Sequence, residues 1–332
     1  PGAACFRWLI QPPVAKGWSV SGTGGPQGQS RIRAQPRGGS PPPSLIVRLP
    51  GFMLWGTGET MKVLIRVLVV VLALVLAAGL AFYFSTWHPA DVQKETVSVA
   101  PGSPVLKSGQ KIKVLSWNVQ FMAGKNYVFF FDEWDNSGPD TRPSAADIGL
   151  TFGEVARVIT AEDPDIILLQ ELDSGAARTD GEDQLARLLG LLPKSYVSST
   201  SVWYWKAAFV PLPQIMGSVG MKLAVISKYR MDEAIRYQLP QMPNNVIVSN
   251  LQFKRAVLEA RFPVEGGKPL SAMSIHQDAF AQGSDTMQRQ VELVHKLLSR
   301  REGEGLPWVI GGDFNLLPPG SSYSLLPDDE KA

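Results

Sequence analysis

The residues best suited to chemistry lie near the end of the chain, at positions 308–319. An apolar run at 308–310 predicts a buried strand that two glycines end. Asp313 and Asn315 follow one residue apart, so in an extended segment their side chains leave the backbone on the same face. A carboxylate accepts from water or binds a metal ion, and an amide donates to an anion. A plain Asp/Asn turn after a strand explains this stretch alone about equally well.

Three earlier predicted strands, at residues 111–117, 165–169 and 270–275, also end on a polar residue. These polar residues are Asn118, Glu171 and His276. Taken singly, a turn former, a surface acid and a satisfied buried imidazole are the more ordinary explanations. Their recurrence favours a common site, because strand ends at one sheet edge converge on one pocket.

The elements that must position these residues alternate between strands and helices. Further strands are predicted at 223–227 and 256–262, and amphipathic helices at 148–160, 183–191 and 286–300. Asp147 is the predicted cap of the first helix. Such a mixture predicts an α/β or α+β layered core that begins at Lys111.

Charge is unevenly distributed along the 332 residues, although the formal net charge is only +2. Residues 1–85 hold eight basic residues against Glu59 alone, and the rest hold 24 basic and 29 acidic residues, a net −5. An acidic folded part is a poor candidate for tight, sequence-independent nucleic-acid binding. Cys5 is the single cysteine, so the folded part has no disulfide or thiol chemistry.

The N-terminal part contains two different segments. Residues 1–60 are rich in Pro, Gly, Ser and Arg, and we expect a disordered or spurious extension before Met61. Residues 67–84 are then an unbroken run of eighteen apolar residues and glycine, long enough as a helix to cross a bilayer. A cleaved signal peptide is the alternative, but signal h-regions are usually shorter. We expect residues 61–88 to be an uncleaved transmembrane anchor.

Sidedness follows from the basic residues before the apolar run. Lys62 and Arg66 should keep the N-terminus in the cytoplasm and place everything after His88 on the periplasmic or extracellular side. Residues 89–110, with Pro and Gly in their middle, are predicted to be a polar tether.

Four of these stretches resemble, in order, the motifs of the endonuclease/exonuclease/phosphatase superfamily. They are Leu-Ser-Trp-Asn-Val-Gln at 115–120, Asp-Ile-Ile-Leu-Leu-Gln-Glu at 165–171, Ser-Ile-His at 274–276 and Gly-Asp-Phe-Asn at 312–315. Residues 223–229 are similar to an interior strand of the family. The family includes deoxyribonucleases, inositol polyphosphate 5-phosphatases and neutral sphingomyelinases. The resemblance spans residues 111–319, and four motifs in order are far more specific than any one.

The resemblance implies a four-layer α/β sandwich, two mixed β-sheets packed face to face between helices, and Mg²⁺-dependent phosphoester cleavage. By position, Glu171 would be the main metal ligand, and Asn118 would help to place metal and phosphate. His276 would donate to the scissile phosphate, Asp313 would orient or activate the attacking water, and Asn315 would hold a phosphoryl oxygen. One glutamate and an amide suffice for Mg²⁺, which keeps several waters, and Mn²⁺ is a possible substitute.

The sequence departs from the family pattern at its end. Members close with a Ser-Asp-His motif well downstream of Asp-Phe-Asn, whereas this sequence stops at Ala332, seventeen residues after Asn315. The three histidines are His88, His276 and His295, and His295 falls within a predicted helix. We therefore expect residues 111–332 to be a C-terminally truncated domain with an incomplete sandwich.

Together these features predict a membrane-tethered, metal-dependent phosphoester hydrolase. Its substrate would be a lipid head group, a nucleotide or nucleic acid, and no obligate protein partner is inferred. The alternative is a non-enzymatic membrane-tethered binding domain, or an inactive fragment of the same fold that lacks the Asp-His motif. Aromatic clusters at 127–131 with Trp134, and at 203–205, are predicted to pack in the core or in loops, or else to flank the site or face lipid.

Overall fold

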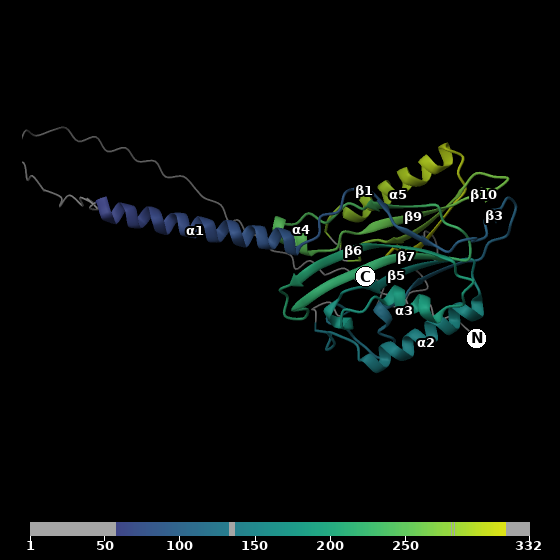
Figure 1. Ribbon diagram of the computed structural model, residues 1–332, viewed down its shortest axis with the longest axis horizontal. Coiled ribbons are helices and arrows are strands. Elements are labelled where there is room, and N and C mark those ends of the chain that lie inside the picture. The colour runs from purple at the N-terminus through teal and green to yellow at the C-terminus, as the bar shows by residue number, and fades with distance from the viewer. Residues whose placement is uncertain (1–57, 133–136, 280, 282, 317–332) are drawn as a thin grey trace, which may run out of the picture. The chain divides into compact units, whose positions relative to one another are not determined.

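The computed structural model describes residues 58–132, 137–279, 281 and 283–316 (Figure 1). The chain divides into two compact units, one containing most of the first helix and the other containing every described residue from Ala81 onward. The predicted extension at residues 1–60 lies outside the described residues as far as position 57.

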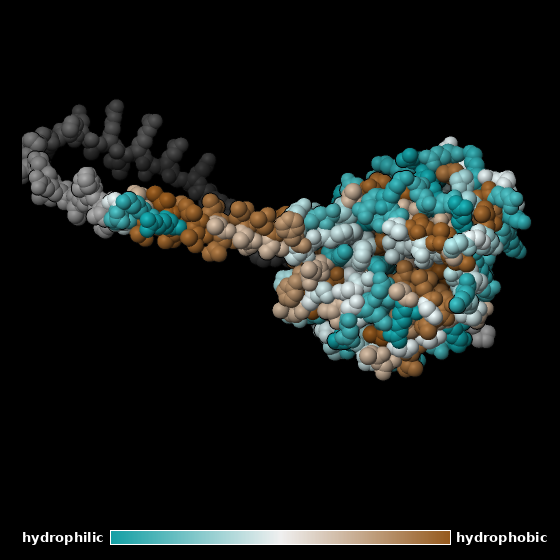
Figure 2. All heavy atoms as spheres, in the orientation of Figure 1, coloured by the Kyte–Doolittle hydropathy of each residue, from teal (hydrophilic) through white to brown (hydrophobic). Residues whose placement is uncertain are grey.

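Helix α1 (Gly58–Ser85) is an unbroken helix of 28 residues, none of them buried. It begins three residues before Met61 and includes the whole apolar run at 67–84. At 1.5 Å per residue it is about 42 Å long, which exceeds the hydrocarbon thickness of a bilayer. Within the described part of the chain, it is the one helix long and apolar enough to cross a membrane. Figure 2 colours most of its length brown.

Two five-stranded sheets form the larger unit. The first has the order β2-β6-β7-β5-β4, and the second has the order β1-β8-β9-β11-β12. In each sheet one pair is parallel, β4 with β5 and β11 with β12, and the other pairs are antiparallel. Strands of the first sheet are β2 (Val97–Val99), β4 (Val114–Asn118), β5 (Ile166–Asp173), β6 (Ser198–Val210) and β7 (Gly217–Ser227). Strands of the second are β1 (Val92–Glu95), β8 (Glu233–Gln238), β9 (Ala256–Phe262), β11 (Leu270–His276) and β12 (Trp308–Asp313).

The remaining elements are short connections and the covering helices. A two-residue pairing joins β3 (Leu106–Lys107) to β10 (Val264–Glu265) in parallel. The helices are α2 (Ala145–Glu162), α3 (Gln184–Leu191), α4 (Val246–Leu251) and α5 (Thr286–Gly303), with 3₁₀ turns at Gln120–Met122 and Ala177–Thr179.

Alternate residues of the central strands build separate layers of core. Leu168 of β5 and Val225 of β7 share one cluster with Leu258 of β9 and Ala272 of β11, so the two sheets pack face to face. The neighbouring residues on β5 and β7 point the other way and pack under α2 and α3. Helix α5 covers the outer face of the second sheet, and Figure 1 shows it on the opposite side from α2 and α3. The predicted arrangement of two packed mixed sheets flanked by helices is confirmed.

The helix caps differ in one case from the prediction. Ser144, not Asp147, caps α2, because the Ser144 hydroxyl accepts from the Asp147 backbone N–H at 3.1 Å. Asp147 lies in the first turn, where a negative charge favours the helix dipole. Asp183 caps α3 and accepts from the Ala186 N–H at 3.1 Å. Both helices therefore begin where a short polar side chain satisfies a free backbone donor.

The predicted polar tether at residues 89–110 is wrong over most of its length. β1 pairs with β8 and β2 pairs with β6, so this segment supplies an edge strand to each sheet. Leu106 is buried in the core between the sheets, and Val97 packs against it. The strands have four and three residues, too few for an alternating pattern to appear in the sequence. The sheets therefore begin well before Lys111.

The aromatic clusters belong mainly to the core. Residues 203–205 lie within β6, a strand of thirteen residues that the sequence analysis missed. Tyr204 and Phe129 are buried in the core between the sheets, and Trp205 packs against that core. Trp134 lies outside the described residues. Packing of these aromatic side chains explains most of both clusters.

Candidate active site

Four strands bring their polar residues to one place, although they belong to two sheets. The Asn118 amide nitrogen donates to Glu171 Oε1 at 2.8 Å and to Asp313 Oδ2 at 3.1 Å. The first contact joins neighbouring strands of one sheet, and the second crosses to the other sheet. A single amide therefore holds two carboxylates next to each other.

Glu171 reaches the site from inside a strand rather than from its end. β5 continues to Asp173, and its pairing with β7 shifts between Leu169 and Leu172. At this bulge Glu171 has a φ of 60°, a conformation that a residue with a side chain adopts at some cost. The bulge breaks the alternation of the strand and aims the glutamate into the site.

Two glycines position Asp313 by allowing close packing rather than by turning the chain. Gly311 and Gly312 lie within β12, so the predicted stop before Asp313 is wrong. A Cβ atom on Gly311 would lie 3.1 Å from Ser116 Cβ of the facing sheet, and one on Gly312 would lie 2.0 Å from the Ile275 carbonyl oxygen. Any side chain here would push β12 away from its neighbours.

Asn315 has a different conformation from the extended one expected. Its φ is 49°, its N–H donates to Asp313 Oδ1 at 3.0 Å, and its side-chain amide donates to the Gln277 carbonyl oxygen at 2.9 Å. Asp313 and Asn315 therefore do not share the face of a strand. Asn315 closes a turn that fixes the Asp313 carboxylate, and it still lines the cavity beside the site.

His276 completes the group as a neutral imidazole. Its Nε2 lies 3.7 Å from Glu171 Oε1 and 3.8 Å from Asp313 Oδ2. Its Nδ1 lies 3.2 Å from the Tyr204 hydroxyl. Burial lowers the pKa of His276 well below its usual value, and the positive charge of Arg255 lowers it further. The carboxylates facing Nε2 favour the tautomer that carries its proton there.

The Glu171 carboxyl is unusually basic for a glutamate. Burial raises its pKa to about 7, against lowering effects of the Asn118 hydrogen bond and of Arg178 and Arg255. The charge of Asp313 adds a smaller upward effect. Within the described residues neither Glu171 nor Asp313 forms an ion pair with lysine or arginine. A cation bound beside Glu171 and Asp313 would therefore stabilise both carboxylates in their ionised form.

The donor set fits a hard cation at Glu171 better than at Asn118. Asn118 Oδ1 accepts from the Gln120 N–H at 3.0 Å, and its amide nitrogen faces the carboxylates. The amide therefore positions the carboxylates instead of presenting its oxygen. Over the described ranges no group of three or more His, Cys, Asp and Glu side chains is arranged to hold a metal. An ion with few protein ligands and several waters, such as Mg²⁺, suits this set.

The sequence analysis missed three residues at the site: Tyr204, Arg178 and Arg255. Arg178 pairs with Asp173 at 2.8 and 2.9 Å. Arg255 is 4% exposed and donates through Nε to Asp278 Oδ1 at 3.3 Å. Its buried Nη1 has no hydrogen-bond partner among the described residues. In the sequence, Arg255 lies directly before the apolar strand predicted at 256–262, and this position could have identified it as a candidate site residue.

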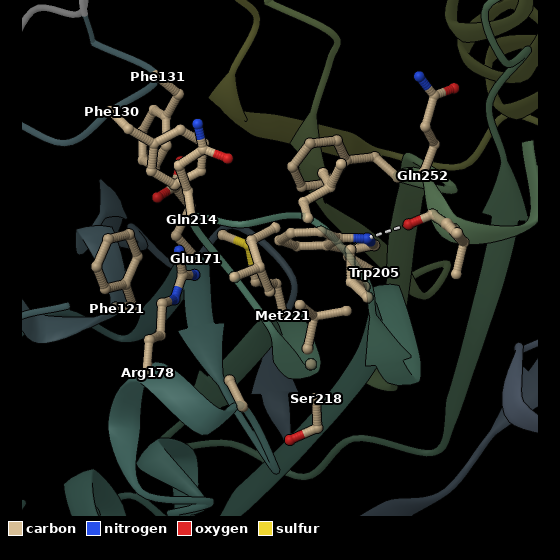
Figure 3. A pocket seen from close by; sticks show the side chains of 18 of the residues that line it. Phe121, Phe130, Phe131, Glu171, Arg178, Trp205, Gln214, Ser218, Met221 and Gln252 are labelled. Carbon is tan, nitrogen blue, oxygen red and sulfur yellow. Dashed lines mark hydrogen bonds between the residues drawn. The ribbon is translucent and has the colours of Figure 1, made fainter. Parts of the chain in front are cut away.

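A cavity of about 550 Å³ opens beside these residues. Glu171, His276, Asp313 and Arg255 line it together with many apolar side chains. In Figure 3, Glu171 and Arg178 lie on one side, Trp205 on the other, and Met221 between them. A bound molecule could thus contact the polar cluster and an apolar surface at once.

Comparison with known proteins found several similar solved structures. Similar solved structures include an endonuclease/exonuclease/phosphatase from Beutenbergia cavernae DSM 12333, at 22% identity and a TM-score of 0.43. That match covers 62% of this chain and 47% of the other. TDP2 from C. elegans matches at 16% identity and a TM-score of 0.40, over 64% and 49% of the two chains. ANGEL2, titled a 2′,3′-cyclic phosphatase, matches at 14% identity and a TM-score of 0.41. That match covers 70% of this chain and 59% of the ANGEL2 chain.

The chain thus spans about half the length of these structures. No curated protein sequence matches it. The family model described as Endonuclease/Exonuclease/phosphatase family, however, matches residues 115–331. The matched range includes Asn118, Glu171, His276, Asp313 and Asn315. The chain belongs to the endonuclease/exonuclease/phosphatase family.

Proposed function

We propose that the folded domain is a divalent-metal-dependent phosphoester hydrolase. One observation carries the proposal: the Asn118 amide joins Glu171 and Asp313 at 2.8 and 3.1 Å, beside a neutral histidine. Four polar groups from two sheets meet beside a cavity, and each has a role in hydrolysis of an anionic ester. Family membership supports the same reaction class.

Glu171 would hold the metal ion, Mg²⁺ or Mn²⁺, and Asn118 would keep both carboxylates in position. When bound, such an ion would offset the negative charge that develops on the phosphoryl group. An ion would also lower the pKa of Glu171 below the value of about 7 that burial gives it.

The other residues have separate roles toward water and phosphate. Asp313 would orient the attacking water and take its proton, since its Oδ1 is fixed by the Asn315 N–H. His276 would donate its Nε2 proton in a hydrogen bond to a phosphoryl oxygen. Arg255 would donate from Nη1, which has no partner among the residues that the structure describes. Water adds to phosphorus, and the ester oxygen leaves as an alcohol.

Asn315 has a narrower role than its position in the motif implies. One N–H of its side-chain amide is bonded to the Gln277 carbonyl. The second N–H remains to hold a phosphoryl oxygen, because an amide nitrogen carries two donors.

Helix α1 would hold this domain at a membrane as a single-pass anchor. Its length and composition support the proposal. Lys62 and Arg66, near the start of the helix, support a cytoplasmic N-terminus and a periplasmic or extracellular domain.

The test uses the protein expressed from its complete reading frame, in detergent, with bis(p-nitrophenyl) phosphate as substrate. We expect turnover that needs added Mg²⁺ or Mn²⁺ and stops with EDTA. Glu171→Gln should lower kcat/KM at least about 100-fold. Glu154→Gln, on an exposed part of α2, is the matched control and should leave turnover unchanged.

Two outcomes would contradict the proposal. Turnover by Glu171→Gln at the wild-type rate in low Mg²⁺ would remove Glu171 from the metal site. Binding of phosphate by wild-type protein without any turnover would favour a non-enzymatic binding domain.

A further inference from the structure

The cavity beside the site is much more apolar than hydrolysis of a small phosphoester requires. Away from the polar cluster, its walls come mainly from aromatic, aliphatic and methionine side chains. They include Ile215 and Phe253, and Phe121, Phe131, Trp205 and Met221, which are labelled in Figure 3. A volume of about 550 Å³ is within the range of sites that bury most of a small organic ligand. An apolar group of the substrate is the natural occupant.

Arg255 links this apolar space to the phosphate chemistry. Its guanidinium lies over the Phe253 ring at 4.3 Å from the centroid, and its buried Nη1 has no hydrogen-bond partner in the described part of the chain. A buried donor without a partner costs free energy, so an anionic acceptor bound there would be favourable. The ligand that satisfies both features has a phosphate next to a hydrocarbon group.

Two segments that contribute side chains to the cavity contain no charged residues, and together they are called the uncharged rim. Other parts of the lining include charged side chains, such as Arg142 and Arg178. Residues 207–221 form the tip of the β6–β7 hairpin, and residues 237–253 lead from β8 through α4 to β9. Neither contains Asp, Glu, Lys or Arg, whereas 19% of the whole chain is charged. The two segments pack together, and Trp205 Nε1 donates to the Leu251 carbonyl oxygen at 2.7 Å.

Large apolar side chains of this rim are exposed. They are Phe209, Leu212 and Met216 on the hairpin and Val246 and Ile247 on α4. The hairpin tip, at the free end of β6 and β7 in Figure 1, is tan rather than teal in Figure 2. An uncharged rim with exposed apolar residues is typical of a surface that contacts a membrane or another apolar partner.

The position of the rim in the chain favours a membrane. Thr86, one residue after the end of α1, forms a β-bridge with Ala207 at the start of the hairpin segment. Lys254, at the end of the other segment, donates to the Trp87 carbonyl oxygen. Residues 86 and 87 follow directly on the apolar helix in the sequence and are bonded, within the folded unit, to the ends of the uncharged rim. Only a few residues of chain therefore separate the apolar run at 67–84 from the residues that bind this rim.

We propose that the cavity receives the hydrocarbon part of a membrane phospholipid, drawn from the bilayer across the uncharged rim, with its phosphodiester at the polar cluster. The proposal rests on the proposed hydrolase function for the reaction. That reaction adds one water to phosphorus and breaks one P–O ester bond. It releases an alcohol and a phosphomonoester, and no oxidant or further reactant is needed.

The first experiment tests the cavity without any catalysis. The full chain is placed in phosphatidylcholine nanodiscs with EDTA, and the fluorescence of its tryptophans, Trp205 among them, reports binding of hexyl, octyl and decyl phosphate. We expect each added methylene to tighten binding up to about fourfold. Met221→Gln, similar in size but polar, should remove most of this gain. Ile215→Asn is a second variant should Met221→Gln fail to fold. Affinity that does not depend on chain length, or a gain unchanged in the variants, would overturn the proposal.

The second experiment tests the membrane as the source. Wild-type chain with Mg²⁺ is compared on nanodisc phospholipid, with products measured by mass spectrometry, and on soluble bis(p-nitrophenyl) phosphate. Val246→Asp with Ile247→Asp should lower phospholipid turnover at least about tenfold and leave soluble turnover unchanged. Neither residue lines the cavity. Leu150→Asp, an exposed leucine on α2, is the matched control and should affect neither substrate.

The outcomes separate the two proposals. If the rim variant does not change phospholipid turnover, or if the wild type cleaves only the soluble diester, the membrane source is wrong. If neither substrate is cleaved, the hydrolase function fails, while dependence of binding on chain length still supports the cavity assignment.

Discussion

At the scale of residues, the site depends on one side-chain amide that donates hydrogen bonds to two carboxylates. Asn118 donates to Glu171 and to Asp313, and its own oxygen is fixed by the Gln120 N–H. The arrangement stabilises carboxylates that would otherwise repel each other in a poorly solvated place. It also explains why the asparagine need not present its oxygen to a metal ion.

The Glu171 pKa predicts how stability depends on pH without metal. The folded-state pKa of about 7 exceeds the ordinary value of 4.5, so the folded protein binds the extra proton between these pH values. In EDTA, the free energy of unfolding should therefore fall as pH rises from about 4.5 to about 7, by roughly 3 kcal/mol for a shift of this size. Urea unfolding at pH 5 and pH 8 measures this change.

Glu171→Gln is the control for that measurement, because it cannot ionise. Its stability should lack this fall with pH, and Mg²⁺ at pH 8 should stabilise wild-type protein but not the variant. Equal pH profiles in the two proteins would show that Glu171 ionises normally.

Asp313→Asn separates a chemical role from a turn-forming role. The variant still accepts from the Asn315 N–H, so we expect a loss of about 1 kcal/mol in unfolding free energy. An Asp that takes a proton from water cannot be replaced in this way, and kcat should fall about 10²–10⁴-fold. Asp165→Asn, whose carboxylate accepts from the Lys113 N–H at the far end of β5, should leave kcat unchanged. A fall in stability with kcat within tenfold of wild type would make Asp313 a turn residue.

At the scale of elements, the site depends on two departures from regular strands. The bulge at Glu171 turns its side chain into the site. In β12, Gly311 lets the two sheets approach closely, and Gly312 lets β12 pack against the neighbouring strand β11. The same sheets are completed by β1 and β2, edge strands from a segment that precedes the recognisable motifs. Edge strands protect the unpaired backbone groups of β8 and β6.

Val97→Ser tests whether residues 89–110 are structural. Val97 packs against the core between the sheets, so the variant should lose about 1 kcal/mol of unfolding free energy. Val99→Ser, two residues on and 44% exposed, should change stability by less than about 0.5 kcal/mol. The urea midpoint of the two variants measures the difference. If residues 89–110 were only a tether, the two variants would have the same free energy of unfolding.

At the scale of the whole molecule, an apolar helix and a domain of the endonuclease/exonuclease/phosphatase family lie on one chain. None of the 28 residues of α1 is buried, so its apolar side chains need another environment. A bilayer would supply one, and under the proposed function the uncharged rim gives a reason for the domain to be held there.

If α1 is a membrane anchor, as proposed, the protein should stay with membranes, and charges placed within α1 should release it. Leu72→Arg with Leu76→Arg places two arginines in the middle of α1, each costing about 2.5–3.5 kcal/mol on insertion scales. We expect wild-type protein to stay with membranes during carbonate extraction and the variant to be released. Replacement of the same leucines by isoleucine is the control and should retain the protein.

Sidedness gives a further prediction. With Lys62 and Arg66 on the cytoplasmic side, protease added to spheroplasts should digest the folded domain. Full protection until the membrane is permeabilised would reverse the proposed orientation.

The sequence alone determined the family, the layered α/β class, the apolar helix and the four polar residues that the strands bring together. These features are local: strand and helix periods, an eighteen-residue apolar run, and short motifs around Asn118, Glu171, His276 and Asp313. Packing decided the rest. The contact of Asn118 with Asp313 joins residues 195 positions apart, and Arg255 reaches the site only through the fold. The Glu171 pKa, the left-handed turn at Asn315 and the short edge strands likewise depend on burial and neighbours, because a local pattern reports which face of an element is apolar but not what that face meets.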